Sequence, residues 1–175
     1  MQSVISHIPN CRYMTYQKFA EINNCSLDDV IQICESKSGC THYDVAHDRY
    51  LILCNRSTSG NNNIGRQRWT CGHEIGHVLC KHHLILPQNK LSENSLLSIK
   101  DKDLEAEADY FAGMLLAPFP LFKVLGVDSP TKIHNIFGLS WEASDYRYDQ
   151  YLRWLQTKFV TAWENDFIKL YNRKS

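Results

Sequence analysis

The stretch RWTCGHEIGHVLCKHH, residues 68–83, carries two histidines four positions apart, His73 and His77, and Glu74 directly follows the first. In an α-helix, residues with this spacing lie about 40° apart on one face, one turn above the other. Two imidazoles placed in this way can bind one tetrahedral zinc ion. Glu74 lies about 100° round the helix from His73, where it can reach a water molecule beside the metal. The spacing therefore predicts a helix that supplies two metal ligands and a general base.

A catalytic zinc ion has three protein ligands and an open fourth position. The stretch LEAEADYFAGMLLAP, residues 104–118, offers the third ligand, because Glu105 and Asp109 stand four apart and share a helix face. We predict that Glu105 binds the metal, and that Asp109 hydrogen-bonds the ring of a ligating histidine and fixes its orientation. Glu107 competes for the ligand role, but it lies about 200° from Glu105 round the helix.

Small residues lie on the predicted metal-binding faces of both helices. Gly76 lies on the histidine face of the first helix, and Ala108 and Ala112 lie beside the third candidate ligand on the second. Small side chains at a contact shorten the distance between two helix axes. The two helices are therefore expected to pack closely enough to share one metal ion.

The overall composition is that of an ordinary globular chain. Of the 175 residues, 43% are hydrophobic and 22% are charged, and 19 basic residues balance 19 acidic ones. A formal net charge of zero argues against direct nucleic-acid binding, which favours a strongly basic domain. The sequence contains no apolar run long enough for a membrane-spanning helix. The start MQSVISHIPNCRY has neither the basic region nor the apolar core of a signal peptide, so we expect a cytoplasmic protein.

The cysteines agree with a reducing compartment. They are scattered along the chain at Cys11, Cys25, Cys34, Cys40, Cys54, Cys71 and Cys80. Their number is odd, and no pair has the C-x-x-C spacing of a zinc ribbon. We expect reduced thiols that pack as small core residues.

Local patterns predict a series of helices interrupted by one β-hairpin. Helices are expected at residues 15–24, 26–37, 65–83, 103–117, 129–137 and 142–172, strands at 41–45 and 50–54, and loops at 55–65 and 87–102. Ser26 is the expected N-cap of the second helix, with Asp29 placed for a capping box. Gly39 is expected to end the same helix.

These elements predict a mostly helical α+β fold with a small antiparallel β-hairpin or sheet. We expect a metal-binding domain at residues 1–125 and a helical extension at residues 126–175 that packs on it. The extension is rich in aromatic residues between Trp141 and Tyr171. Packing on the first domain is the simpler interpretation of these rings, and a docking surface for a partner is the alternative.

The end of the first metal-binding helix carries three further polar residues, Cys80, His82 and His83. Histidines at a helix C-terminus interact favourably with the helix dipole, so His82 and His83 are expected to be solvated there. Cys80 falls within about 20° of His73 round the helix, although a packed core thiol is its simpler role.

The two motifs together resemble the ImmA/IrrE family of metallopeptidases. The segment RQRWTCGHEIGH is similar to the family's lead into His-Glu-x-Gly-His, and EAEADYFAGMLLAP begins 28 residues after His77, like the family's second helix. Trp69 replaces the family's usual Phe, and Asp109 replaces its common Asn. The resemblance covers about residues 65–150 and is weak before residue 60.

The resemblance implies a zincin-like core of the gluzincin type. His73, His77 and Glu105 would then be the ligands of Zn²⁺ and Glu74 the general base of a hydrolase that cuts peptide bonds. Family members often cleave a helix-turn-helix repressor encoded nearby, frequently on phages or mobile elements. The implied partner is therefore one specific folded protein in the cytoplasm.

A DNA-binding regulator is one alternative function. Residues 131–152, TKIHNIFGLSWEASDYRYDQYL, have the rhythm of a helix-turn-helix with Gly138 at the turn. The second helix offers a poor surface for phosphates, because Asp145 and Asp149 are accompanied only by Arg147 between them and Arg153 after them.

A metal-stabilised interaction module without turnover is the other alternative. It would use the same three ligands as a peptidase. Only Glu74 separates the two classes, because a purely structural metal site has no use for a general base.

Overall fold

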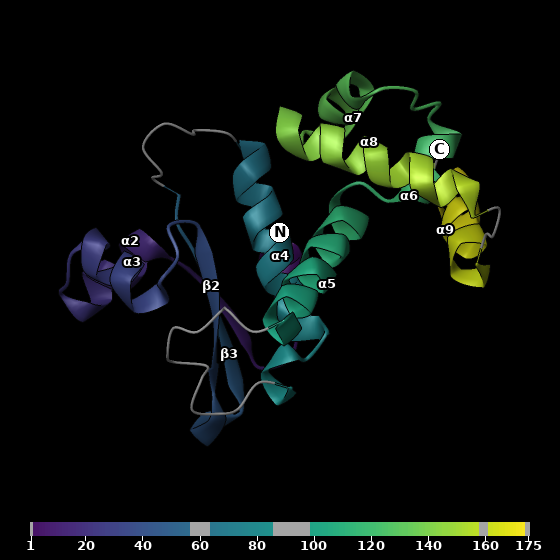
Figure 1. The fold of residues 1–175 in the computed structure, drawn as a ribbon. Helices are drawn as coiled ribbons and strands as arrows, with labels where there is room; N and C mark the ends of the chain where they lie inside the picture. The colour runs from purple at the N-terminus through teal and green to yellow at the C-terminus, as the bar shows by residue number, and fades with distance from the viewer. Residues whose placement is uncertain (1, 57–63, 86–98, 158–160, 174–175) are drawn as a thin grey trace. The chain divides into compact units, whose positions relative to one another are not determined.

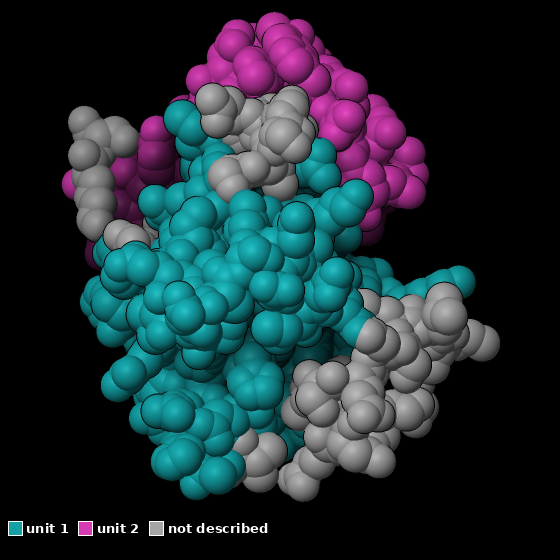
Figure 2. Space-filling model, turned by 90° about the vertical axis from the view of Figure 1, so that its left-hand side faces the viewer, with its two compact units in different colours: residues 1–112 teal, residues 113–175 magenta. Residues whose placement is uncertain are grey.

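The computed structural model describes residues 2–56, 64–85, 99–157 and 161–173 (Figure 1). The elements are, in order, α1 (Gln2–Ile5), β1 (Cys11–Thr15), α2 (Tyr16–Asn23), α3 (Leu27–Cys34), β2 (Gly39–Asp44), η1 (Val45–His47), β3 (Arg49–Cys54), α4 (Ile64–Leu79), η2 (His82–Leu84), α5 (Ile99–Leu116), α6 (Phe119–Val124), α7 (Pro130–Phe137), α8 (Trp141–Gln156) and α9 (Ala162–Asn172). The chain forms two compact units, residues 1–112 and 113–175, which Figure 2 shows in separate colours. The domain boundary predicted at residue 125 stays a prediction.

The predicted class, a mostly helical α+β fold, is confirmed, with a three-stranded sheet of order β1–β3–β2 in the described residues. β2 and β3 form the predicted antiparallel hairpin, with Thr41 opposite Ile52. β1 pairs in parallel with β3, Cys11 opposite Tyr50, and the sequence pattern did not predict it. This strand is short and its partner lies far along the chain, so its pairing depends on tertiary contacts. None of the described helices combines the length and apolar character needed to cross a membrane.

The two faces of the sheet pack against different helices, because successive side chains of a strand point to opposite sides. The buried cluster on one face joins the sheet to α2 and α3 and contains Tyr16, Ala20, Val30 and Leu53. On the other face, Thr41 of β2 contacts Glu74 of α4 through a side-chain hydrogen bond. The sheet therefore packs against α4, the helix that carries the predicted metal ligands (Figure 1).

Local signals set the start of α3 as predicted, but not its end. Asp29 N–H donates to Ser26 Oγ over 3.1 Å, and Ser26 N–H donates to the Asp29 carboxylate over 2.8 Å, which confirms the capping box. Glu35, with a left-handed φ of 50°, terminates the helix. The prediction that Gly39 ends it was wrong, since Gly39 opens β2.

α4 is shorter than predicted and α5 is longer. α4 ends at Leu79, and Lys81 then adopts a left-handed conformation with φ 57°, which turns the chain into η2. α5 begins at Ile99, before the predicted start at residue 103. The loops predicted at residues 55–65 and 87–102 lie mostly outside the described residues.

The second unit has its own aromatic core. Its packed rings belong to Phe119, Phe122, Tyr151 and Trp154. Arg147 is fully buried there, with its guanidinium carbon 3.6 Å from the centre of the Phe119 ring and its Nε donating to the carbonyl of Ala117. Tyr151 and Trp154, two of the aromatic residues of the predicted extension, therefore hold the helices of this unit together.

Candidate metal centre

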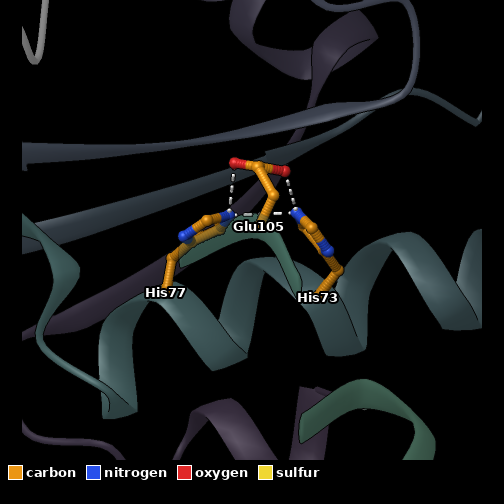
Figure 3. A group of neighbouring side chains, drawn as sticks. All are labelled: His73, His77 and Glu105. Atoms are coloured by element: carbon orange, nitrogen blue, oxygen red, sulfur yellow. Dashed lines mark hydrogen bonds and ion pairs between the residues drawn. The ribbon is translucent and has the colours of Figure 1, made fainter. Parts of the chain in front are cut away.

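Three side chains from two helices of the first unit meet at one point (Figure 3). His73 and His77 come from α4 and Glu105 comes from α5. The Nε2 atoms of the two histidines lie 3.0 Å apart. Glu105 places Oε2 3.0 Å from His73 Nε2 and Oε1 3.3 Å from His77 Nε2. The structure thus brings the three predicted ligands together, and it places Glu105 rather than Glu107 in this cluster.

The spacing of the donor atoms fits a tetrahedral metal ion. Ligand atoms about 2.0–2.1 Å from a zinc ion lie about 3.3–3.4 Å from one another in a tetrahedron. Here the two imidazole nitrogens lie 3.0 Å apart, and the two oxygens of Glu105 lie 3.0 Å from His73 Nε2 and 3.3 Å from His77 Nε2. Two imidazoles and one carboxylate suit zinc, and three protein donors leave the fourth corner of a tetrahedron for water or substrate.

Small residues allow the close approach of α4 and α5 that the cluster requires. A Cβ atom at Gly76 would lie 3.1 Å from both the Cα and the carbonyl oxygen of Ala108, and 3.3 Å from the Cβ of Phe111. Ala108 is itself fully buried. Glycine at 76 therefore sets the distance between the two helices that carry the donor atoms, as the sequence predicted.

We expect Gly76→Ala to weaken zinc binding and to lower the melting temperature of the metal-free protein. The added methyl group must displace the backbone of Ala108 by a few tenths of an ångström, which moves Glu105 relative to the histidines. Overpacking costs about 1–3 kcal/mol, which exceeds the roughly 1 kcal/mol that alanine gains over glycine in a helix. Thermal unfolding without metal and zinc competition against a chelator measure the two effects. A higher melting temperature with unchanged zinc affinity would contradict this account.

Asp109 orients the ring of His73 from the side away from the cluster. Its Oδ1 lies 2.9 Å from His73 Nδ1 and accepts a second hydrogen bond, of 3.1 Å, from the indole N–H of Trp69. With Nε2 facing the other donor atoms, the Nδ1–H of His73 donates to Asp109. A carboxylate in this position fixes both the tautomer and the direction of a ligating imidazole.

Charge couples the members of the cluster in the metal-free protein. Burial lowers the pKa of His73, but the carboxylates of Asp109, Glu105 and Glu74 outweigh it and raise the pKa to about 10. Hydrogen bonds with His73 and His77 hold the pKa of Glu105 well below its usual range. His73 is therefore protonated at neutral pH before a metal enters. A metal ion that binds Nε2 of His73 displaces the proton from that atom.

Glu74 lies buried on the sheet side of α4. Its Oε2 accepts a hydrogen bond of 2.7 Å from Thr41 Oγ1. Burial raises the pKa of the Glu74 carboxyl, while the Thr41 hydroxyl and the nearby imidazoles oppose this rise. A Cβ atom at Gly39 would lie 3.2 Å from Glu74 Oε1, so glycine at this position keeps the second oxygen uncrowded. A carboxyl with a raised pKa next to a group of candidate metal ligands suits the work of a general base.

His82 and Glu107 form a second polar cluster, which the sequence did not predict. His82 Nδ1 lies 2.7 Å from His77 Nδ1, and His82 Nε2 lies 3.1 Å from Glu107 Oε2. The prediction that His82 is solvated was wrong: its exposed fraction is 2%, and burial lowers its pKa. His82 lies beyond the end of α4, so helical periodicity carried no signal for this contact. The left-handed turn at Lys81 returns it to His77.

The predicted helix-turn-helix pattern corresponds to α7 and α8, separated by Gly138 with a left-handed φ of 64°. Arg147 of α8 is fully buried and donates to groups of its own unit. It is therefore held away from any phosphate that could approach the surface. This finding weakens the DNA-binding interpretation, which already depended on very few cations.

The fold and the side-chain cluster together define a class of protein. A mostly helical α+β chain that joins two imidazoles of one helix to a carboxylate of the next, with a buried carboxyl beside them, has the composition of a metallopeptidase site. The chain belongs to the Peptidase_M78 family, because the family model, described as the IrrE N-terminal-like domain, matches residues 31–149. It is therefore a metallopeptidase in type, with a protein or peptide substrate, and the resemblance to ImmA/IrrE proteins is confirmed.

The matched region begins in α3 and ends in α8, so it includes every candidate site residue. Comparisons with curated proteins and with solved structures found no significant match.

Proposed function

We propose that this chain is a zinc-dependent endopeptidase that makes limited cuts in one intracellular protein, a helix-turn-helix repressor encoded nearby. The observation that carries the proposal is the meeting of His73, His77 and Glu105 at 3.0–3.3 Å, next to the buried carboxyl of Glu74. Membership of a peptidase family and the fit of the donor atoms to zinc support it.

Glu74 would act as the general base and then as the general acid. A zinc ion held by the three donors would supply Lewis acidity, which polarises a peptide carbonyl and makes a nearby water molecule more acidic. Thr41 donates a hydrogen bond to Glu74 Oε2, which holds the carboxylate that would accept the proton of the attacking water. Glu74 then returns this proton to the nitrogen of the leaving amine, and its raised pKa favours the earlier step, in which it accepts the proton.

The edge strand β2 supports a mode of substrate binding. β2 lies at one edge of the three-stranded sheet, and Thr41 in its middle bonds directly to Glu74. An extended peptide that added to this edge would gain main-chain hydrogen bonds and would pass beside Glu74. Main-chain pairing with β2 does not depend on the side chains of the peptide. It therefore accounts for binding of an extended segment, but it does not explain why one protein would be cut in preference to others.

Selectivity for one protein requires contacts beyond the metal site. α9 exposes a stripe of large apolar side chains at helical spacing, Trp163, Phe167 and Leu170, with exposed fractions of 52%, 37% and 56%. An apolar stripe of this kind is typical of a helix that contacts a partner. We take it to be the docking surface through which binding energy positions the scissile bond.

We expect the zinc-loaded protein to cut the neighbouring repressor at one or a few bonds and to leave casein almost intact. Mass spectrometry of the products after timed incubation locates the bonds, and Glu74→Gln serves as the matched control for contaminating proteases. Cutting of casein with the repressor left intact would indicate a general peptidase. No cutting of either, together with DNA binding that weakens steeply as salt rises, would favour the regulator.

A further inference from the structure

A buried histidine connects the candidate metal ligand His77 to a carboxylate on the other helix. His82 Nδ1 lies 2.7 Å from His77 Nδ1, and His82 Nε2 lies 3.1 Å from Glu107 Oε2. The side chain of His82 is only 2% exposed. A chain of hydrogen bonds therefore runs from His77 through His82 to Glu107, and its central ring is shielded from solvent.

One assignment of protons satisfies both contacts. A metal ion on His77 Nε2 leaves the ring proton on Nδ1, because a neutral imidazole carries one N–H. This Nδ1–H must donate, and the atom that faces it is Nδ1 of His82, which then accepts. His82 consequently carries its own proton on Nε2, which faces the Glu107 carboxylate and donates to it. Every ring nitrogen in the chain then has a partner of the right kind.

The turn that presents His82 is fixed by contacts with the sheet. Lys81 has a left-handed φ of 57°, and Leu84 N–H donates to Lys81 O over 2.9 Å. The next residue, His83, lies with its ring centre 4.1 Å from that of Tyr43 on β2 and bonds to the hydroxyl of Tyr50 on β3. His82 is thus held in place by the structure and does not depend on the metal for its position.

A second metal ion is the competing use of this cluster. Cys80, His82 and Glu107 place one potential donor atom each within 4.8 Å of the others. A metal on His82 Nε2 would leave the proton of His82 on Nδ1, where it would face the Nδ1–H of His77 across 2.7 Å. Two donors cannot share that distance, so a second ion is incompatible with a metal on His77 in this geometry. The arrangement favours hydrogen bonding over a second site.

We propose that His82, anchored by Glu107, is a positioning residue that fixes the tautomer and the ring direction of His77. It would do for His77 what Asp109 does for His73, except that a second imidazole stands between the ligand and the carboxylate. This inference rests on the proposed function, because it assumes that His77 binds the metal. Groups that support a ligating histidine from behind are worth about 10- to 100-fold in metal affinity.

The test compares zinc affinity, by chelator competition, in the parental protein and in His82→Phe, Glu107→Ala and Glu107→Gln. We expect zinc to bind about 10- to 100-fold more weakly to His82→Phe and Glu107→Ala. Glu107→Gln keeps an oxygen that accepts from His82, so we expect it to recover much of the affinity. His42→Phe, at an exposed position of β2, is the matched control and should bind zinc like the parent. The absorption spectrum of bound cobalt(II) reports ligand geometry independently of activity, and it should change in His82→Phe.

Each outcome decides a different question. Parental protein that binds no zinc would overturn the proposed function and this inference with it. Parental protein that binds one equivalent, with the same affinity and cobalt spectrum in Glu107→Ala and in a folded His82→Phe, would overturn the inference alone. A second zinc equivalent that disappears in His82→Phe and in Cys80→Ser would show that the cluster is a metal site. Should His82→Phe fail to fold, the pair Glu107→Ala and Glu107→Gln still decides, because neither removes the buried ring.

Discussion

Glu74→Gln is expected to lower the rate of peptide cleavage by at least about 10²-fold, the usual contribution of a general acid–base group. The protein should keep its fold, because the amide oxygen of glutamine can still accept the hydrogen bond from Thr41. It should also keep its metal, because Glu74 is not among the three donors that meet at 3.0–3.3 Å. Initial rates on the cleaved substrate, with zinc content and melting temperature measured on the same samples, test all three statements.

The matched control for this variant is Glu21→Gln, an exposed glutamate of α2 outside the site. It changes the same functional group and should leave the rate unaltered. A Glu74→Gln protein that cuts at the parental rate would show that the hydrolytic mechanism is wrong, whatever the metal content. A variant that loses its zinc would instead place Glu74 among the ligands.

The part of the candidate site that can be predicted from the sequence is the part that is set within a single helix. The spacing of His73 and His77 fixes their common face on α4, and the spacing of Glu105 and Asp109 does the same on α5. Gly76 also allows one prediction about how the two helices pack, because a glycine inside a helix permits another backbone to approach closely. These local regularities fix which side chains share a face on each helix, and the packing of α4 against α5 then brings the three side chains together.

Contacts that depend on a turn conformation, or on pairing between strands far apart in the sequence, could not be predicted from helical spacing. His82 reaches His77 only because Lys81 adopts a left-handed conformation, which nothing in the residue type lysine predicts. Glu74 is anchored by Thr41, whose side-chain direction depends on the register between β2 and β3. The strand β1 was missed for the same reason, because its partner is set by the tertiary fold. The residues around the ligands were thus harder to predict than the ligands themselves.

Removal of two donors at once, His73→Ala with Glu105→Ala, is expected to abolish zinc binding. The parental protein should retain about one equivalent of zinc after purification without chelator, as a site with three protein donors would. The double variant keeps only His77, and it also leaves Asp109 without the imidazole that it orients. Elemental analysis of the two proteins gives the metal content directly.

Thermal unfolding tests the same prediction without relying on purification history. A ligand present at 100 times its dissociation constant stabilises the folded state by about 2.7 kcal/mol. Added zinc should therefore raise the melting temperature of the parental protein by several degrees and leave that of the double variant unchanged. The control is the double variant His42→Ala with Glu21→Ala, which removes the same two residue types from exposed positions and should respond to zinc like the parent. Zinc bound at one equivalent by the His73→Ala, Glu105→Ala protein would place the metal elsewhere, and the cluster of Cys80, His82 and Glu107 would then be the first position to test.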